Sequence, residues 1–205
     1  MKISIVVTQE EHFKFAQEIC DTIESSALLR GTGIAKRTPE YIQKKMSNGD
    51  AMIALADGKF AGFCYIESWQ HGKFVAHSGL IVHPDYRSLG LAKKIKSKVF
   101  DYSLQRYPDA KIFGITTGLA VMKINSDLGY KPVPFSELTT DPSFWAGCKT
   151  CTNYQILQSK ENKMCLCTGM LYDPKEKQKI PPKHPFNEKV LNRLRTIKQA
   201  LFLKK

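Results

Sequence analysis

The chain has 205 residues, 42% of them hydrophobic, and a formal net charge of +12. This length is enough for one well-packed core and a small appendage. No apolar run is long enough to span a bilayer, and the apolar start at residues 3–7 is too short for a signal-peptide core, so we expect a soluble, cytoplasmic protein without a membrane partner. Six cysteines without a secretory signal suit a reducing compartment.

The positive charge is concentrated at the C-terminal end. Residues 174–205 contain ten Lys or Arg and two Glu, a net charge of +8, which leaves +4 for the rest of the chain. A basic tail is more typical of a peripheral helix than of a nucleic-acid arm. The body also lacks the alternation of aromatic and basic residues that single-strand binding needs. Nucleic acid is therefore not the expected partner.

The N-terminal half predicts an alternation of strands and helices. Residues 3–7 are rich in β-branched side chains. Thr38 followed by Pro39 is typical of a helix N-terminus, and Asp57-Gly58 is typical of a hairpin turn. The expected elements are a strand at 3–7, helices at 9–29 and 38–46, and strands at 51–56, 60–69 and 74–82.

The next part of the chain continues this pattern. Leu91, Ile95, Val99 and Tyr102 fall on one face of a predicted amphipathic helix. Gly129 is a natural C-cap for a short helix that precedes it. The expected elements are the helix from residue 91, a strand at 111–117, a helix at 120–128 and a strand at 130–133.

The turn between the strand at 74–82 and the following helix predicts an anion site. Backbone N–H groups at a helix N-terminus lack partners, and the helix dipole adds partial positive charge there. Gly90 and Ala92 allow a phosphate to approach the backbone, Ser88 adds a hydroxyl, and Arg87 adds a charge that pairs well with phosphate. An ordinary strand-to-helix connection with a surface arginine is the alternative.

The pattern Val82-x-Pro84-x-x-Arg87-x-x-Gly90-x-Ala92 resembles the acyl-CoA-binding motif of the GNAT superfamily of N-acetyltransferases. The resemblance covers about residues 1–135 and implies an α+β fold, with a mixed, mostly antiparallel sheet flanked by helices. It also implies an enzyme that uses acetyl-CoA or another acyl-CoA. By this resemblance, the pyrophosphate-binding residues are Arg87, Ser88, Leu89, Gly90, Leu91 and Ala92. Leu80, Ile81 and Val82 line the pantetheine and offer a backbone donor to the thioester oxyanion.

The catalytic residues are less well defined by the sequence. When the family's second motif is aligned on Gly129-Tyr130, its tyrosine general acid falls on Asn125 and its asparagine on Gly118. An asparagine can hydrogen-bond a leaving thiolate but cannot protonate it. The candidate bases, which would deprotonate an amine acceptor directly or through water, are Glu67, His77 and Ser78.

A glycine-containing loop at residues 30–37 carries three cations. Arg30, Lys36 and Arg37 could bind the carboxylates of a dicarboxylic acceptor, since GNAT enzymes commonly recognise acceptors in this region. A solvent-exposed connection between helices is the alternative.

The C-terminal third contains four clustered cysteines. Cys148, Cys151, Cys165 and Cys167 could place four thiolates around zinc, although Cys-x-Cys is tighter than a usual knuckle and free thiols are favoured over zinc. Residues 164–172 also alternate well enough for a plain strand.

The expected organisation is a GNAT domain at 1–135, a cysteine-containing extension packed on it at 136–174, and a basic linker with an amphipathic helix at 175–205. That helix would dock on the body or on a second subunit, which allows a homodimer.

Several segments narrow the resemblance. The loop at 30–37, the CoA segment and the cysteine segments resemble a group of compact GNAT proteins associated with arginine biosynthesis. This resemblance implies acylation of the α-amino group of glutamate from acetyl-CoA or succinyl-CoA. The alternatives are a GNAT enzyme that acetylates a protein lysine or a polyamine, and a zinc-knuckle nucleic-acid-binding protein on a GNAT scaffold.

Overall fold

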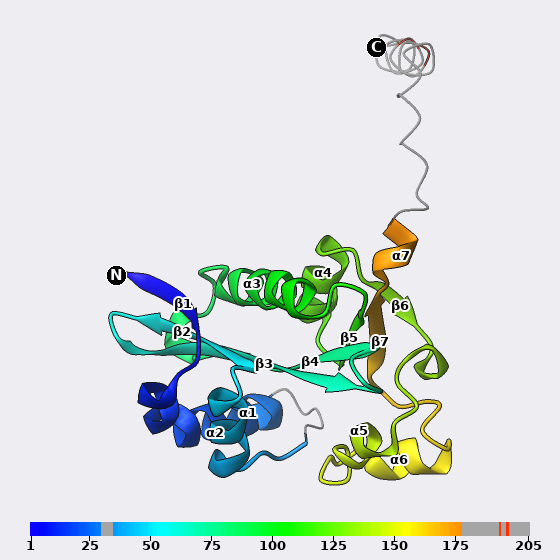
Figure 1. Ribbon diagram of the computed structural model, residues 1–205, viewed down its shortest axis with the longest axis horizontal. Coiled ribbons are helices and arrows are strands. Elements are labelled where there is room, and N and C mark those ends of the chain that lie inside the picture. The colour runs from blue at the N-terminus through cyan, green and yellow to red at the C-terminus, as the bar shows by residue number, and fades with distance from the viewer. Residues whose placement is uncertain (30–34, 178–192, 194–195, 197–205) are drawn as a thin grey trace, which may run out of the picture. The chain divides into compact units, whose positions relative to one another are not determined.

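The computed structural model describes residues 1–29, 35–177, 193 and 196 (Figure 1). Residues 1–173 form one unit and residues 174–205 a second, of which the short helix α7 (Pro174–Lys177) is described. Most of the predicted C-terminal helix lies outside the described residues. Among the helices that are described, none combines the length and the apolar character needed to cross a membrane.

A seven-stranded sheet runs through the first unit, in the order β1-β2-β3-β4-β5-β7-β6. Of its strand pairs, β4–β5 is parallel and the others are antiparallel. The sheet confirms the predicted mixed, mostly antiparallel arrangement. Its strands are β1 (Ile3–Val7), β2 (Ala51–Ala56), β3 (Lys59–Trp69), β4 (Phe74–Val82), β5 (Lys111–Thr116), β6 (Lys131–Val133) and β7 (Thr168–Tyr172).

Helices cover both faces of this sheet (Figure 1). α1 (Ala16–Leu29) and α2 (Pro39–Ser47) lie on one face, and α3 (Leu91–Arg106) and α4 (Leu119–Asp127) lie on the other. Thr38 caps α2 as predicted, because its hydroxyl accepts a hydrogen bond from the Tyr41 backbone N–H at 3.3 Å. The shorter helices are η1 (Glu10–Phe15), η2 (Pro84–Tyr86), η3 (Phe135–Glu137), α5 (Pro142–Ala146) and α6 (Tyr154–Ser159).

Two predicted elements differ from the structure. The helix expected at residues 9–29 is divided into the 3₁₀ helix η1 and α1, because the His12 ring accepts a hydrogen bond from the Gln9 backbone N–H at 2.9 Å and tightens the first turns. The strand expected at residues 164–172 begins only at Thr168. As β7 it lies between β5 and β6, so the cysteine-containing extension contributes a strand to the sheet itself.

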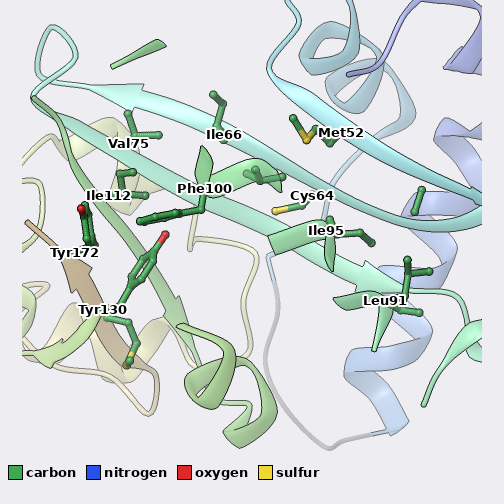
Figure 2. Packing of buried hydrophobic residues seen from close by; sticks show 14 of the residues in the cluster. Met52, Cys64, Ile66, Val75, Leu91, Ile95, Phe100, Ile112, Tyr130 and Tyr172 are labelled. Atoms are coloured by element: carbon green, nitrogen blue, oxygen red, sulfur yellow. The ribbon is translucent and has the colours of Figure 1, made fainter. Parts of the chain in front are cut away.

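Two hydrophobic clusters pack against the opposite faces. The first joins the sheet to α3 through Leu91, Ile95 and Val99, as the helical spacing predicts. In it, the Phe100 ring packs against the rings of Tyr130 and Tyr172, with centroids 5.7 and 4.8 Å away (Figure 2). The second cluster joins α1 and α2 to the other face. Its members include Ile19, Ile23, Ile42, Met46, Phe63 and Tyr65.

A β-bulge interrupts β4 at Gly79 and Leu80. Tyr65 pairs with Ser78 and Phe63 pairs with Ile81, so two residues of β4 lie opposite one residue of β3. Val75, Leu80 and Val82 all pack into the first cluster, on the α3 face. In a regular strand, odd- and even-numbered side chains point to opposite faces, so the bulge is what brings these three to the same face. Gly79 has φ +63°, and a Cβ there would lie 2.6 Å from the Tyr65 ring.

The β4–β5 ladder is short. It joins Phe74–Ala76 to Lys111–Phe113, although β4 continues to Val82 and β5 to Thr116. In the described chain, the strands therefore part just before the bulge. Along the second half of β4, the backbone groups that face β5 are therefore not paired with it. Another extended group can pair with this edge.

The bulge gives a stability prediction. Gly79→Ala places a methyl group against the buried Tyr65 ring and also strains a positive φ. We expect a loss of about 2–4 kcal/mol in the free energy of unfolding, measured by urea titration. Gly58→Ala is the matched control, because Gly58 also has a positive φ but no atom lies within 4 Å of its added Cβ. Equal losses in the two variants would contradict the packing role of Gly79.

Candidate functional site

The turn predicted to bind an anion connects β4 to α3. Gly90 is the N-cap of α3 with φ +68°, and the first backbone hydrogen bond of the helix runs from the Lys94 N–H to the Gly90 carbonyl at 3.2 Å. The N–H groups of the preceding helical positions point out of the helix end. Residues 88–90 are exposed, so the turn at the N-terminus of this 16-residue helix is open to an anion, which the helix dipole would favour.

The Arg87 side chain has partners within the protein. Its Nε donates to the Val82 carbonyl at 3.3 Å and its Nη2 donates to the Ser26 hydroxyl at 2.8 Å. Ser26 lies on α1 and is buried. Arg87 therefore ties the end of β4 to α1 and positions the turn, and its predicted contact with phosphate stays a prediction.

A polar network lies on the α1–α2 side of the sheet, beside the bulge. The Glu67 carboxylate accepts a hydrogen bond from the Tyr41 hydroxyl at 2.5 Å and lies 3.2 Å from the Lys45 ammonium. The Ser78 hydroxyl donates to its other oxygen at 3.4 Å. Two of the predicted base candidates, Glu67 and Ser78, are thus brought together.

The network continues to one of the predicted substrate cations. Arg37 Nε donates to the Tyr65 hydroxyl at 2.6 Å, and its guanidinium lies 5.5 Å from the centre of the Tyr41 ring. Burial works against the charge of Arg37, but Tyr65, Tyr41 and Glu67 outweigh it and raise its pKa. Burial, with Tyr65 and Glu67, raises the pKa of Tyr41. Burial also raises the pKa of Tyr65, against the lowering effect of Arg37, so both phenols are neutral and can donate hydrogen bonds.

The other predicted substrate cations do not join this network. The Lys36 ammonium pairs with Glu24 at 3.0 Å on the surface, while its backbone N–H donates to the Thr150 hydroxyl at 2.8 Å. Arg30 lies outside the described residues. Arg37 is therefore the predicted cation that the described structure brings to Glu67.

His77 lies on the opposite side of the sheet from Glu67. It is 7% exposed, with Nε2 2.8 Å from the Ser103 hydroxyl and Nδ1 3.1 Å from the Tyr130 hydroxyl. Burial, together with the charge of Lys96, lowers the pKa of His77 well below its ordinary value. These contacts give His77 a place in the core under α3, on the face away from Glu67, and its role as a base stays a prediction.

Asn125 is buried on α4, at the position where the resemblance places a tyrosine. It is 1% exposed, and its backbone carbonyl accepts hydrogen bonds from the N–H groups of Leu128 and Tyr130. Its side-chain Oδ1 is buried and has no hydrogen-bond partner within the described structure. Buried acceptors are seldom left without a donor, so this oxygen is a candidate for a ligand contact.

The four clustered cysteines line one cavity, and none forms a disulfide. Burial and the neighbouring thiols raise the pKa of Cys148 to about 11 and that of Cys167 to about 12. Within the described residues, no group of three or more His, Cys, Asp or Glu side chains is already arranged to hold a metal ion.

Tyr41, Lys45 and Tyr65 are site residues that the sequence analysis missed. Tyr41 and Lys45 are four residues apart on α2, which places them on one helix face. Tyr65 and Glu67 are two apart on β3, which places them on one face of the strand. These spacings were visible in the sequence. Only the packing of α2 against β3, however, brings the two pairs of residues together.

Comparison with known proteins identifies the family. Residues 20–119, which include the bulge and the turn, match the sequence profile of the "Acetyltransferase (GNAT) family". The chain carries a GNAT acetyltransferase domain. Its resemblance to this superfamily is thereby confirmed, and the match supports the expected enzyme class, an N-acyltransferase. A search of curated proteins found no match.

Solved structures share the GNAT fold. N-acetylglutamate synthase from Neisseria gonorrhoeae, complexed with coenzyme A and N-acetyl-glutamate, is 13% identical with a TM-score of 0.61 over 84% of this chain and 35% of that chain. This chain thus spans about a third of that protein. A GNAT-family acetyltransferase from Staphylococcus aureus Mu50 is 14% identical, with a TM-score of 0.60 and coverage of 84% and 99%. A putative acetyltransferase from Salmonella typhimurium, with its cofactor acetyl-CoA, is 16% identical, with a TM-score of 0.57 and coverage of 84% and 94%.

The buried cation beside His77 gives a pH prediction. Lys96 is 2% exposed, and burial lowers its pKa from 10.5 to about 8. Between these two pKa values the unfolded chain binds more protons than the folded domain. The free-energy cost of burying Lys96 therefore falls as the pH rises. Lys96→Met should therefore stabilise the protein at pH 7, by on the order of 3 kcal/mol at most. We expect this gain to shrink toward pH 10.5.

Urea titrations of the wild type and the variant at several pH values measure this difference. Lys94→Met is the control, since Lys94 is an exposed neighbour on the same helix. A gain for Lys96→Met that is the same at pH 7 and pH 10 would show that Lys96 is not held in a costly charged form.

Proposed function

We propose that this GNAT enzyme transfers an acetyl or succinyl group from acyl-CoA to the α-amino group of glutamate. The observation that carries the proposal is the charge around Glu67. Arg37 and Lys45 surround this single carboxylate, and the hydroxyls of Tyr41 and Tyr65 connect them. Cations exceed carboxylates in this network, and guanidinium and ammonium groups are the natural partners of substrate carboxylates.

The position of the network supports its use for the acceptor. Ser78 joins Glu67 to β4 at the residue before the bulge. The turn at residues 87–92, at the far end of β4, offers the anion site for the CoA pyrophosphate. Between them, the edge of β4 that β5 leaves unpaired is suited to the extended pantetheine arm. An acyl group carried on that arm would reach the bulge, where Glu67 approaches β4.

The chemistry requires loss of a proton and stabilisation of an oxyanion. The acceptor ammonium first gives a proton to Glu67, directly or through water. The free amine then forms a bond with the thioester carbonyl carbon, and a backbone N–H at the bulge near Leu80 stabilises the oxyanion. The carbon–sulfur bond breaks, the nitrogen loses its second proton as the amide forms, and the CoA leaves as thiolate. A neutral phenol or water protonates the sulfur and takes up the proton from the nitrogen, because Asn125 cannot supply a proton.

The acceptor and the donor can be tested together. Release of free CoA thiol is measured with acetyl-CoA and succinyl-CoA against glutamate, aspartate, a lysine peptide and spermidine. We expect turnover with glutamate, and the better donor identifies the acyl group. Turnover confined to the peptide or to spermidine would contradict the glutamate proposal and favour the alternative acceptors. No thiol release with any pair, together with steeply salt-dependent binding to DNA or RNA, would favour the nucleic-acid-binding alternative.

A variant of Arg37 tests the acceptor side separately. Arg37→Lys keeps a positive charge but loses the planar contact, and Arg37→Met loses both. If Arg37 binds an acceptor carboxylate, the Met variant should raise KM for glutamate by roughly 10–100-fold and leave KM for acyl-CoA unchanged. Lys44→Met is the matched control, because Lys44 is an exposed cation on α2, the helix that follows Arg37. Equal changes in the two KM values would mean that Arg37 acts only on the fold.

A further inference from the structure

Four of the six cysteines, separated by up to 19 positions in the sequence, meet at one small cavity. Two come from the segment between α5 and α6, and two from the segment that leads into β7. We call this set the thiol cluster; its members are Cys148, Cys151, Cys165 and Cys167. All four are free thiols that are partly exposed, and Cys167 lies within electrostatic reach of the other three.

The cavity is suited to a single ion. Its volume is ≈ 20 Å³, which is room for about one water-sized particle and too little for an organic cofactor. Apart from the thiols, its walls include the apolar side chains of Ile115, Phe135 and Leu157. These three side chains belong to β5, η3 and α6, and the ionisable groups that line the cavity are the four thiols and the Tyr154 phenol.

The local backbone brings the two cysteine pairs together. A turn closes the first pair, with the Cys151 N–H donating to the Cys148 carbonyl at 2.9 Å. The chain then reverses after α6, where Glu161 and Asn162 have φ +51° and +61°. Cys165 then returns to the N-terminal end of α6, where its thiol lies 3.9 Å from the Asn153 carbonyl. The left-handed turn at Glu161 and Asn162 costs conformational free energy, because non-glycine residues rarely adopt a positive φ.

From this geometry we propose that the thiol cluster binds one zinc ion with four thiolate ligands. Four sulfur ligands favour tetrahedral zinc, and Cys-x-x-Cys supplies one pair at a usual spacing. Because the thiols enclose the cavity without yet forming a ligand group, binding must draw them inward. Residues 160–167 are free of regular secondary structure, so this movement does not disturb a strand or a helix. Each thiol that binds the ion releases its proton.

The bound ion would also stabilise the wall next to the acceptor network. Thr150, between the first two cysteines, accepts the hydrogen bond from the Lys36 backbone N–H, and Lys36 precedes Arg37. Arg37 is close enough to Cys148 to influence its thiol. A metal that fixes residues 148–151 would therefore hold the approach to Arg37, while the turn at residues 87–92 would not depend on it.

The metal content of the full chain tests this inference. The protein is purified without a metal-affinity tag, under reducing conditions and with zinc in the growth medium, and zinc is measured by mass spectrometry of the native protein and by elemental analysis. We expect one zinc ion per chain in the wild type. Cys148→Ser and Cys167→Ser should each lose most of it. Cys20→Ser is the matched control, because Cys20 lies in the α1–α2 core, and it should keep the ion.

A second measurement avoids variants that fail to fold. Alkylation of wild-type thiols is followed with and without a zinc chelator. Binding predicts that four thiols are protected until the chelator is added, and that the chelator lowers the melting temperature until zinc is restored. A wild type that holds no zinc after supply of the ion, alkylation that the chelator does not change, or disulfides in the thiol cluster would each overturn the proposal. These readouts do not involve catalysis, so they stand apart from the test of the acceptor.

Discussion

The bulge in β4 is the constraint on which both faces of the site depend. Gly79 adopts a positive φ against the Tyr65 ring, and this allows two residues of β4 to lie opposite one of β3. Ahead of the bulge, Ser78 reaches the face that carries Glu67. Beyond it, Leu80 and Val82 pack on the α3 face, and the strand leads to the turn at residues 87–92. The bulge at Gly79 thus determines which side chains would contact each substrate.

The two faces of the sheet differ in how their charged side chains are paired and buried. On the α1–α2 face, Arg37, Lys45 and Glu67 are joined by neutral tyrosine hydroxyls, so charged groups stay in partial contact with solvent and with one another. On the α3 face, His77 and Lys96 are fully enclosed, and burial disfavours the charged form of both. The first arrangement is suited to a polar acceptor, while the second makes the core beneath α3 sensitive to pH.

Local signals in the sequence predicted most of the fold. β-branched runs, the Thr38-Pro39 cap and the spacing of Leu91, Ile95 and Val99 each depend on neighbouring residues, and the corresponding elements are confirmed. The place of β7 between β5 and β6 was not predictable in this way, because it depends on a pairing across more than fifty residues. The strand was also expected to be longer, since the alternation at residues 164–167 has no neighbouring strand to pair with.

The site was predicted less completely than the fold, for a similar reason. The turn at residues 87–92 could be found because its chemistry lies in consecutive residues. Alternation places His77 and Ser78 on opposite faces of the sheet, but it could not tell which of these faces binds the acceptor. The burial of Lys96, whose ammonium lies 5.1 Å from the centre of the Tyr130 ring, was not predicted.

The central claim is that the acyl donor and the acceptor meet at the bulge. A crystal structure of the protein with CoA and N-acetylglutamate or N-succinylglutamate tests it most directly. The account predicts the pyrophosphate at the N–H groups of residues 88–92 and the carboxylates of the glutamate moiety at Arg37, with its amide beside Glu67. A glutamate moiety bound on the α3 face, or away from Arg37 and Glu67, would contradict the account.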